Sequence, residues 1–399
     1  MSDAFEELRQ QVREWLAAHP PPDRDFALPQ SMLSVSTDEQ FDYLRDWQAR
    51  VYDAGFVGSE WPAEYGGGGR PAGSQRAIDQ ELSRADVPYL INMVGLSWAG
   101  PIILKFGTEA QKKRYLAKLL RADEIWCQGF SEPGAGSDLA SLQTAAVRDG
   151  DDYVIDGHKV WTTLGRFAHH MILLARTDPD AGKHAGISYF LSPMKVDGVQ
   201  VVPLIKLTGE EGFNQIIFTQ ARIPSDTLLG REGQGWELAI ATLNFERGAS
   251  EGSAGGAGGF GAAPTEALFE LARGLVRDGR PALQDPGVRD RLAAFAIEAA
   301  AIRYSGQRMR VPALCSDRPM ALPLLSKVAV TEFVQRLADF GCEVQGYAGT
   351  LYAGDPAALD SGDWQKQYLN SYANTIAGGT SEIVRNVIGE KVLGLPKTR

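Results

Sequence analysis

The spacing of apolar residues changes twice along this 399-residue chain, and these changes limit the folds that it can adopt. In the first third, apolar residues recur at the spacing of an amphipathic helix, as in Phe5, Leu8, Val12 and Trp15. From about residue 140, short runs rich in β-branched and aromatic residues alternate with turn sequences such as RDGDD. Helical spacing returns near Gly235 and continues to the C-terminus, so the predicted order is α, then β, then α.

The β-rich runs follow one another closely with no helical pattern between them, which predicts a small antiparallel barrel or sandwich. The chain is also too long for one small core, so we expect several packed units. The predicted fold class is therefore α+β and multidomain, with an N-terminal α-helical domain over residues 1–122, a middle antiparallel β-barrel or sandwich over 123–233, and a C-terminal α-helical bundle over 234–399. Thr108 with Gln111 predicts a capping box in the first domain.

The composition argues against several classes of function. A net charge of −10 at pH 7 disfavours a nucleic-acid surface or an anionic-membrane anchor. No run approaches the roughly 20 apolar residues of a membrane span, and the N-terminus has acidic residues from Asp3, so neither a span nor a signal peptide is expected. The three cysteines and five histidines lack metal-ligand spacing, and no metal is predicted. We expect a cytoplasmic protein whose partners are small molecules or proteins.

The first stretch that points to chemistry is WCQGFSEPGAGSDLASLQTAA, residues 126–146, at the boundary between the helical and β-rich parts. Its Ser-Glu-Pro-Gly sequence from Ser131, with Gly136 and Ser137 behind it, predicts a tight polar turn whose main-chain N–H groups face a polar ligand. Taken alone, such a turn is more often structural than functional.

The second stretch, GHKVWTTLGRF over residues 157–167, places Trp161 in a β run beside Thr162 and Thr163. A lone tryptophan in a strand is usually part of the core. Together with the polar turn, however, a large ring beside two hydroxyls suits the face and edge of an aromatic cofactor.

The third stretch, YANTIAGGTSEIVRN over residues 372–386, places Gly378 and Gly379 before Thr380 and Ser381 at the start of a helical pattern. This sequence suits a main chain that comes close to a flat or anionic group, yet no carboxylate stands at its centre. A separate glycine-rich stretch over 248–264 lacks a phosphate-binding signature, and we predict a mobile loop there, at the mouth of a site.

These stretches resemble the acyl-CoA dehydrogenases, flavoenzymes that desaturate acyl-CoA thioesters between the α and β carbons. SEPGAGSDL is similar to the family's T/S-E-P-x-x-G-S-D turn, GHKVWTT to its G-x-K-x-W-x-T/S strand, and GGTSEIVRNVIGEKVLGLP to its C-terminal G-T-x-x-I-x-R helix. The resemblance spans nearly the whole chain and agrees with the α, β, α order. It implies the acyl-CoA dehydrogenase fold.

The resemblance implies an FAD cofactor and an acyl-CoA substrate, held by residues of all three stretches. The residues then expected to contact FAD are Gln128, Phe130 and Ser131 at the pyrimidine side of the isoalloxazine, Gly136 and Ser137 at the pyrophosphate or CoA, Trp161 on the flavin ring, Thr163 near N5, and Thr380 and Glu382 at the start of the C-terminal helix. Ser137 and Arg247 are expected to contact the substrate.

The chain departs from the family at the catalytic base. Most members carry a glutamate immediately before the Gly-Thr pair of the third stretch, and this chain has Gly378 there. A minority branch carries the base on the first helix of the C-terminal domain, in a Glu-Arg pair, and Glu246 with Arg247 fits that branch. On helix geometry alone, Glu246 lies at the edge of an apolar arc, which suits either a base or a partly buried carboxylate paired with an arginine.

The resemblance predicts FAD-dependent α,β-dehydrogenation of an acyl-CoA thioester to the 2-enoyl-CoA, in which Glu246 removes the α-proton and flavin N5 accepts the β-hydride. A ribityl hydroxyl of FAD and the main-chain N–H of Gly378 would stabilise charge on the thioester oxygen. Because glycine leaves room that glutamate would fill, we hypothesise a wide cavity for branched or bulky acyl groups, including sterol side chains.

The resemblance implies an electron-transferring flavoprotein as electron acceptor, whereas an acyl-CoA oxidase would use O2. The family's R-x-x-F-G stretch is missing, and its Q-x-x-G-G-x-G run appears only as EVQGYAG over residues 343–349. A homo- or hetero-oligomer is expected, and the third alternative is an FAD-holding subunit of a hetero-oligomeric dehydrogenase.

Overall fold

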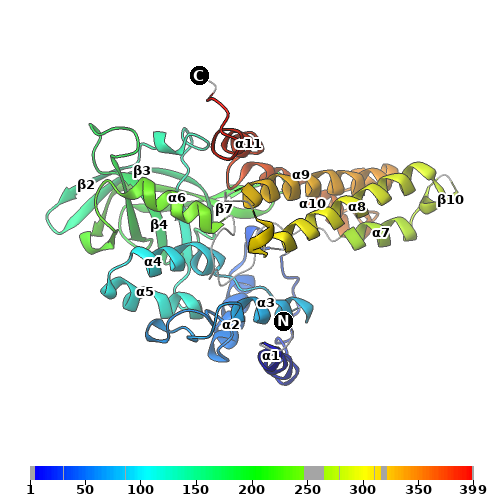
Figure 1. Ribbon diagram of the computed structural model, residues 1–399, viewed down its shortest axis with the longest axis horizontal. Helices are drawn as coiled ribbons and strands as arrows, with labels where there is room; N and C mark the ends of the chain where they lie inside the picture. Colours follow the sequence, from blue (N-terminus) through cyan, green and yellow to red (C-terminus); the bar gives the residue numbers. More distant parts are fainter. Residues whose placement is uncertain are drawn as a thin grey trace. The chain divides into compact units, whose positions relative to one another are not determined.

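The computed structural model describes residues 5–29, 31–85, 87–246, 265–277, 279–309, 311–315 and 321–397. The chain divides into two compact units, Met1–Gly259 and Phe260–Arg399. The order of elements along the chain is helical, then β, then helical, as predicted (Figure 1). The predicted boundaries at 122 and 233 stay a prediction, and the glycine-rich stretch 248–264 lies outside the described residues.

The first unit begins with amphipathic helices whose apolar stripes face its core. Their bounds are α1 (Glu6–Ala18), α2 (Asp38–Asp53), α3 (Ser74–Arg84), α4 (Gly100–Phe106) and α5 (Glu109–Arg121), with a π-helical turn η3 (Gly95–Ala99) before α4. In α2 the apolar residues Phe41, Leu44, Trp47 and Val51 recur at helical spacing, and all four are buried. The helical spacing therefore identified the core-facing side of this helix.

A capping box opens α5 and joins the helix to the sheet. Thr108 Oγ1 accepts from the main-chain N–H of Gln111, and Gln111 Oε1 accepts from the N–H of Thr108, as predicted. The structure adds that Gln111 Nε2 donates to the carbonyl oxygens of Asp226 (2.8 Å) and Leu228 (2.9 Å). One amide side chain thus caps a helix and holds the end of the β part against it.

The β part forms one eight-stranded sheet in the order β6-β7-β3-β2-β4-β5-β8, with β1 beside β4. The strands are β1 (Trp126–Gly129), β2 (Ala145–Asp149), β3 (Asp152–Thr163), β4 (His170–Arg176), β5 (Ile187–Pro193), β6 (Val199–Ile205), β7 (Glu211–Pro224) and β8 (Leu228–Leu229). Most neighbours are antiparallel, as predicted, whereas β1 and β2 each pair with β4 in parallel. These parallel pairings join strands from distant parts of the chain, so local spacing could not predict them.

Helix α6 (Gly235–Glu246) packs within the first unit, against β5, η3 and α4. It contributes to an apolar core that also includes Trp47 of α2, Leu119 of α5, Trp126 of β1 and Tyr189 of β5. The N-terminal helices, the sheet and α6 therefore share one core, which the division of the sequence into separate domains did not predict.

The second unit is helical, and its long helices α8, α9 and α10 lie side by side (Figure 1). Its elements are α7 (Thr265–Gly274), β9 (Val276–Arg277), β10 (Arg280–Pro281), α8 (Pro286–Arg308), α9 (Ala321–Val344), α10 (Asp363–Ile376) and α11 (Ser381–Val387). Phe295, Phe333, Leu337, Phe340 and Trp364 are among the residues of its core. In either unit, no helix within the described ranges has the length and hydropathy to cross a membrane.

A buried polar cluster near the start of α3 contains a carboxyl with an unusual pKa. Gln75 Nε2 donates to Asp79 Oδ1 (2.9 Å), and its Oε1 accepts from the N–H of Ser59 (2.9 Å). Burial raises the pKa of Asp79 to about 7, although the hydrogen bond from Gln75 opposes the shift and nearby Glu60 adds to it. Asp79 therefore titrates near neutral pH in the folded protein.

We expect Gln111→Ala to lower the free energy of unfolding by about 2–3 kcal/mol, because it removes half of the capping box and two hydrogen bonds to the sheet. Thr108→Ala removes only the cap acceptor and should cost about 1 kcal/mol, while Thr108→Ser keeps the hydroxyl and serves as the control. Urea unfolding followed by tryptophan fluorescence measures these losses. Equal losses for Gln111→Ala and Thr108→Ala would contradict the role of Gln111 in joining α5 to the sheet.

We expect Asp79→Asn to stabilise the protein increasingly as pH rises towards neutrality. The folded pKa is about 7, above the unfolded value of about 4, so between these values the folded state holds a proton that the unfolded state has released. The stability of the wild type therefore falls as pH rises through this window, whereas the amide of the Asp79→Asn variant keeps an acceptor for Gln75 without titrating. Melting temperatures of both proteins at about pH 5 and about pH 8 test this sign. A stability difference that does not grow with pH would contradict it.

Candidate active site

The polar turn follows β1 directly and is folded by its own main chain. The residues Glu132 and Ala135 exchange both N–H···O bonds, at 3.1 and 3.0 Å. Phe130 is buried and packs edge-on against Tyr189, with 5.8 Å between ring centroids, whereas Gly136 and Ser137 are exposed. The turn is therefore buried where it begins, at Phe130, and exposed to solvent at Ser137.

Trp161 is not a core residue, although a tryptophan in a strand usually is. Its side chain is 61% exposed, and its φ is +63°, in the left-handed region that a bulky residue rarely adopts. The pairing of β3 with β7 shifts between Lys159 and Thr162, so a β-bulge carries Trp161. Bulges are common beside active sites because they redirect one side chain. The cofactor interpretation of Trp161 is therefore favoured over the core interpretation.

Buried polar atoms lie on the same two segments. Thr162 is fully buried and Thr163 nearly so, and Asn214 Nδ2 donates to the carbonyl oxygen of Thr162 at 3.1 Å. Several buried side-chain atoms of the described residues make no hydrogen bond, and Gln128 Nε2 and Thr162 Oγ1 are two of them. Buried polar groups without partners are costly in a folded protein, so these two atoms can form hydrogen bonds with a bound ligand.

Hydrogen bonds bring the first two sequence stretches side by side. The N–H of Val160 donates to the carbonyl oxygen of Ser131 at 3.0 Å. Lys159 Nζ donates to the carbonyl oxygen of Phe130 at 3.2 Å and to Glu132 Oε1 at 2.8 Å. The turn and the bulged end of β3 therefore form one structural element.

Glu132 and Lys159 form a buried ion pair within this element. Burial lowers the pKa of Lys159 to about 8, and the attraction of Glu132 limits that fall. Burial alone would raise the pKa of Glu132, but Lys159 and the amides of Gln143 and Thr144 hold it below its usual range. Both residues stand inside the stretches that the sequence singled out, yet the sequence analysis gave neither a role. Only the three-dimensional contact shows that they are partners.

The third stretch lies in the second unit and spans the end of α10 and the start of α11. Gly378 and Gly379 have φ values of +65° and +95°, and Lys327 Nζ donates to the carbonyl oxygen of Gly379 at 2.7 Å. Thr380 is the N-cap of α11 and accepts from the N–H of Ile383 at 3.2 Å, and Glu382 in its first turn has a lowered pKa because it bonds its own N–H and the Thr380 hydroxyl. The positive φ at position 378 favours glycine over other residues, and the sequence alone did not show this conformational requirement.

Helix α6 ends at Glu246; the Glu246 side chain and all of Arg247 lie outside the described residues. The buried face of α6 includes Leu238, Ala239 and Thr242, whereas Ile240 is 41% exposed. The Tyr189 hydroxyl lies 3.1 Å from Thr242 Oγ1. The Thr242 hydroxyl in turn donates to the Leu238 carbonyl oxygen at 2.9 Å. The helix is thus held against β5 one turn before Glu246.

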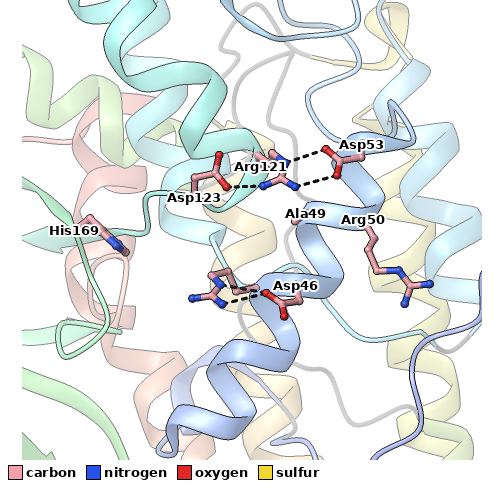
Figure 2. Close-up of a pocket in the computed structure, with 8 residues that line it drawn as sticks. Asp46, Ala49, Arg50, Asp53, Arg121, Asp123 and His169 are labelled. Atoms are coloured by element: carbon pink, nitrogen blue, oxygen red, sulfur yellow. Dashed lines mark hydrogen bonds and ion pairs between the residues drawn. The ribbon is translucent and has the colours of Figure 1, made fainter.

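A groove of about 470 Å³ opens on the helical part of the first unit (Figure 2). Arg121 stands at its centre and binds Asp53 through Nε (2.9 Å) and Nη2 (3.0 Å) and Asp123 through Nη1 (2.7 Å). The positive charge of Arg121 is therefore compensated by two carboxylates. The described residues that line the groove come from none of the three stretches, and we do not include it in the candidate site.

Three family models match this chain over most of its length. Residues 2–123, 127–221 and 233–393 match the models of the acyl-CoA dehydrogenase N-terminal, middle and C-terminal domains. The fold is that of a three-domain flavoprotein oxidoreductase. The chain belongs to the acyl-CoA dehydrogenase family.

Among its relatives, acyl-CoA dehydrogenase IpdE1 of Mycobacterium tuberculosis is 39% identical over 395 residues, which cover 98% of each chain. Among solved structures, the Tcur3481-Tcur3483 steroid ACAD has a TM-score of 0.81 at 30% identity, over 100% of this chain and 99% of that one. The ChsE4-ChsE5 complex from Mycobacterium tuberculosis has a TM-score of 0.78 at 30% identity, with the same coverage. In the part of the chain that the structure describes, no group of three or more His, Cys, Asp or Glu residues is arranged to hold a metal ion.

We expect Trp161→Gly to give a more stable apoprotein than Trp161→Ala, by about 1 kcal/mol, because only glycine adopts the positive φ without strain. Both variants lose the indole and its edge contact with Phe213, so their difference isolates the backbone. Thermal unfolding of the two apoproteins measures it. Equal melting temperatures would show that the backbone at 161 is not strained.

Proposed function

We propose that this chain binds FAD and catalyses the α,β-dehydrogenation of an acyl-CoA thioester to the 2-enoyl-CoA, with Glu246 as the base that removes the α-proton. The observation that carries the proposal is the joined turn and bulge, where an exposed Trp161 stands beside buried polar atoms without partners. An aromatic ring system with polar edges fits this combination. Membership of the family supports the cofactor and the reaction.

The residues present fit FAD. Trp161 offers a broad exposed ring for stacking, and Gln128 Nε2 and Thr162 Oγ1 offer hydrogen bonds to the polar edge of a flavin. Phe130, Ser131 and Thr163 complete the predicted ring contacts, and Gly136, Ser137, Thr380 and Glu382 are the remaining predicted contacts. The bound cofactor supplies a hydride acceptor for the β carbon of the substrate.

The protein's part of the reaction is to remove a weakly acidic α-proton. A carboxylate can do so only if charge on the thioester oxygen is stabilised at the same time. We assign the proton to Glu246 and one stabilising hydrogen bond to the main-chain N–H of Gly378, and Arg247 and Ser137 to substrate binding. The bond from Tyr189 to Thr242 supports the assignment of Glu246, because it fixes α6 one turn before the base.

We propose a bulky acyl group as the substrate. Gly378 replaces the glutamate of most family members and leaves space beside the thioester. The similarity to a steroid ACAD supports a polycyclic or branched acyl thioester, including a sterol side chain. Turnover of straight-chain thioesters alone would contradict this substrate class.

We also propose that the chain works in a hetero-oligomer and passes electrons to an electron-transferring flavoprotein in the cytoplasm. The support is that two similar structures, Tcur3481-Tcur3483 and ChsE4-ChsE5, each pair two named chains. The same observation favours a second candidate function, an FAD-holding subunit that needs a partner for catalysis. An acyl-CoA oxidase would differ because O2 would rapidly reoxidise its reduced flavin.

The experiment is anaerobic mixing of the FAD-loaded protein with straight, branched and sterol-derived acyl-CoAs while the oxidised flavin absorbance is followed. We expect the wild type to bleach with the bulky thioesters and Glu246→Gln to bleach about 10²–10⁴-fold more slowly, because the general base is lost. Glu237→Gln is the matched control, since Glu237 lies on the same helix, is exposed and accepts a hydrogen bond from Gln234.

Bleaching of Glu246→Gln at the wild-type rate would reject Glu246 as the base. If the wild type holds FAD and responds to no thioester, the FAD-holding subunit becomes the better candidate. Rapid recolouring of the reduced enzyme on admitting air would favour the oxidase.

A further inference from the structure

We infer that Glu132 and Lys159 are positioning residues for the flavin, and that their buried ion pair holds the polar turn and the bulged end of β3 in one fixed arrangement. This inference rests on the proposed binding of FAD. It concerns two side chains that contact the main chain of the candidate site rather than the reacting atoms.

The pair crosslinks segments that are separate in the sequence. The Lys159 side chain is fully buried, and Glu132 is 9% exposed. Glu132 Oε1 accepts from Lys159 Nζ (2.8 Å) and from the N–H of Thr144 (2.9 Å), while Oε2 accepts from the N–H of Gln143 (2.7 Å). The carboxylate therefore links the turn after β1 both to the residues immediately before β2 and to β3.

Lys159 extends the crosslink to the main chain at Phe130. Its ammonium group donates to the Phe130 carbonyl oxygen at 3.2 Å, and the neighbouring N–H of Val160 donates to the Ser131 carbonyl oxygen at 3.0 Å. Phe130 and Ser131 are residues that we assign to the flavin ring. The hydrogen bonds of Lys159 and Val160 thus fix the orientation of two successive peptide groups in the ring-binding turn.

Lys159 also marks one edge of the bulge that exposes Trp161. Lys159 is the last residue paired regularly with β7, opposite Ile216, and pairing resumes at Thr162 opposite Asn214. At that second edge, Asn214 Nδ2 holds the Thr162 carbonyl oxygen. Trp161, with its positive φ, therefore lies between two side-chain interactions, the Glu132–Lys159 ion pair and the hydrogen bond from Asn214. Of these two, the ion pair also contacts the polar turn.

The hydrogen bonds of this ion pair are better suited to fixing the position of the main chain than to raising the stability of the fold. A buried ion pair often contributes little more than apolar residues of the same volume, because removing both charges from water is costly. Directed hydrogen bonds from the pair nevertheless define where three main-chain segments lie, which apolar side chains cannot do. Without them, the turn and Trp161 lose the fixed spacing needed to contact opposite parts of one rigid ring.

The test uses Glu132→Gln, Lys159→Met and the double variant, which keeps the side-chain volumes and removes both charges. The control is Arg222→Gln on the same sheet, because Arg222 forms exposed ion pairs with Asp149 (2.8 Å) and Asp152 (3.3 Å). Each apoprotein is titrated with FAD to obtain Kd, and bound flavin is examined by visible circular dichroism. Thermal unfolding of each apoprotein reports the fold.

We expect the double variant to remain folded, to bind FAD on the order of tenfold more weakly and to change the circular dichroism of the bound flavin. The Arg222→Gln control should match the wild type in both measurements. A double variant that binds FAD with the wild-type Kd and spectrum would overturn the inference. If all three Glu132 and Lys159 variants fail to fold, the pair serves the fold as a whole, and the inference is overturned as well. If the wild-type apoprotein itself fails to bind FAD, the proposed function fails instead.

Discussion

The first unit depends on one apolar core that three separate stretches of chain build together. Trp47 comes from the N-terminal helices, Trp126 and Tyr189 from the sheet, and Leu238 from α6. Burial of such side chains is the dominant favourable term in folding, so none of these stretches completes its core alone. The sheet that carries Trp161 is therefore held in place by helices at both ends of the unit.

Several polar side chains that cross this core have hydrogen-bond partners, and these bonds link the N-terminal helices to the strand that leads into the candidate site. Gln48 accepts from the N–H of Asn92 and donates to the Leu120 carbonyl oxygen, while Asn92 accepts from the N–H of Trp126 at the start of β1. The same principle holds for Glu132 and Lys159 at the end of that strand. Because an unsatisfied buried group is costly, each of these bonds limits how far its segment can shift. The position of the polar turn after β1 follows from this series of hydrogen bonds.

Much of the fold and part of the site could be predicted from the sequence, because the signals are local. The spacing in α2, the capping box at Thr108, the order of elements and the polar turn after β1 depend on residues close together in the chain. The parallel pairings of β4, the ion pair of Glu132 with Lys159 and the shared core depend on residues far apart, so no local pattern contains them. The exposure of Trp161 could be predicted only in part. The motif that contains Trp161 is local in the sequence, whereas the bulge that exposes the side chain depends on the register of β3 with β7. The roles assigned to Glu246 and Arg247 stay predictions.

The burial of Lys159 also has a chemical consequence for an enzyme of this family. Acyl-CoA thioesters acylate neutral amines, forming an amide and releasing the CoA thiol, and a lysine with a pKa of about 8 has roughly a tenth of its amine neutral at pH 7. An exposed lysine with this pKa would be a ready nucleophile towards acyl-CoA thioesters. Because the side chain has no exposed surface and its nitrogen is held by Glu132 and Phe130, the thioester cannot reach it. The same burial that lowers the pKa thus protects the amine from self-acylation.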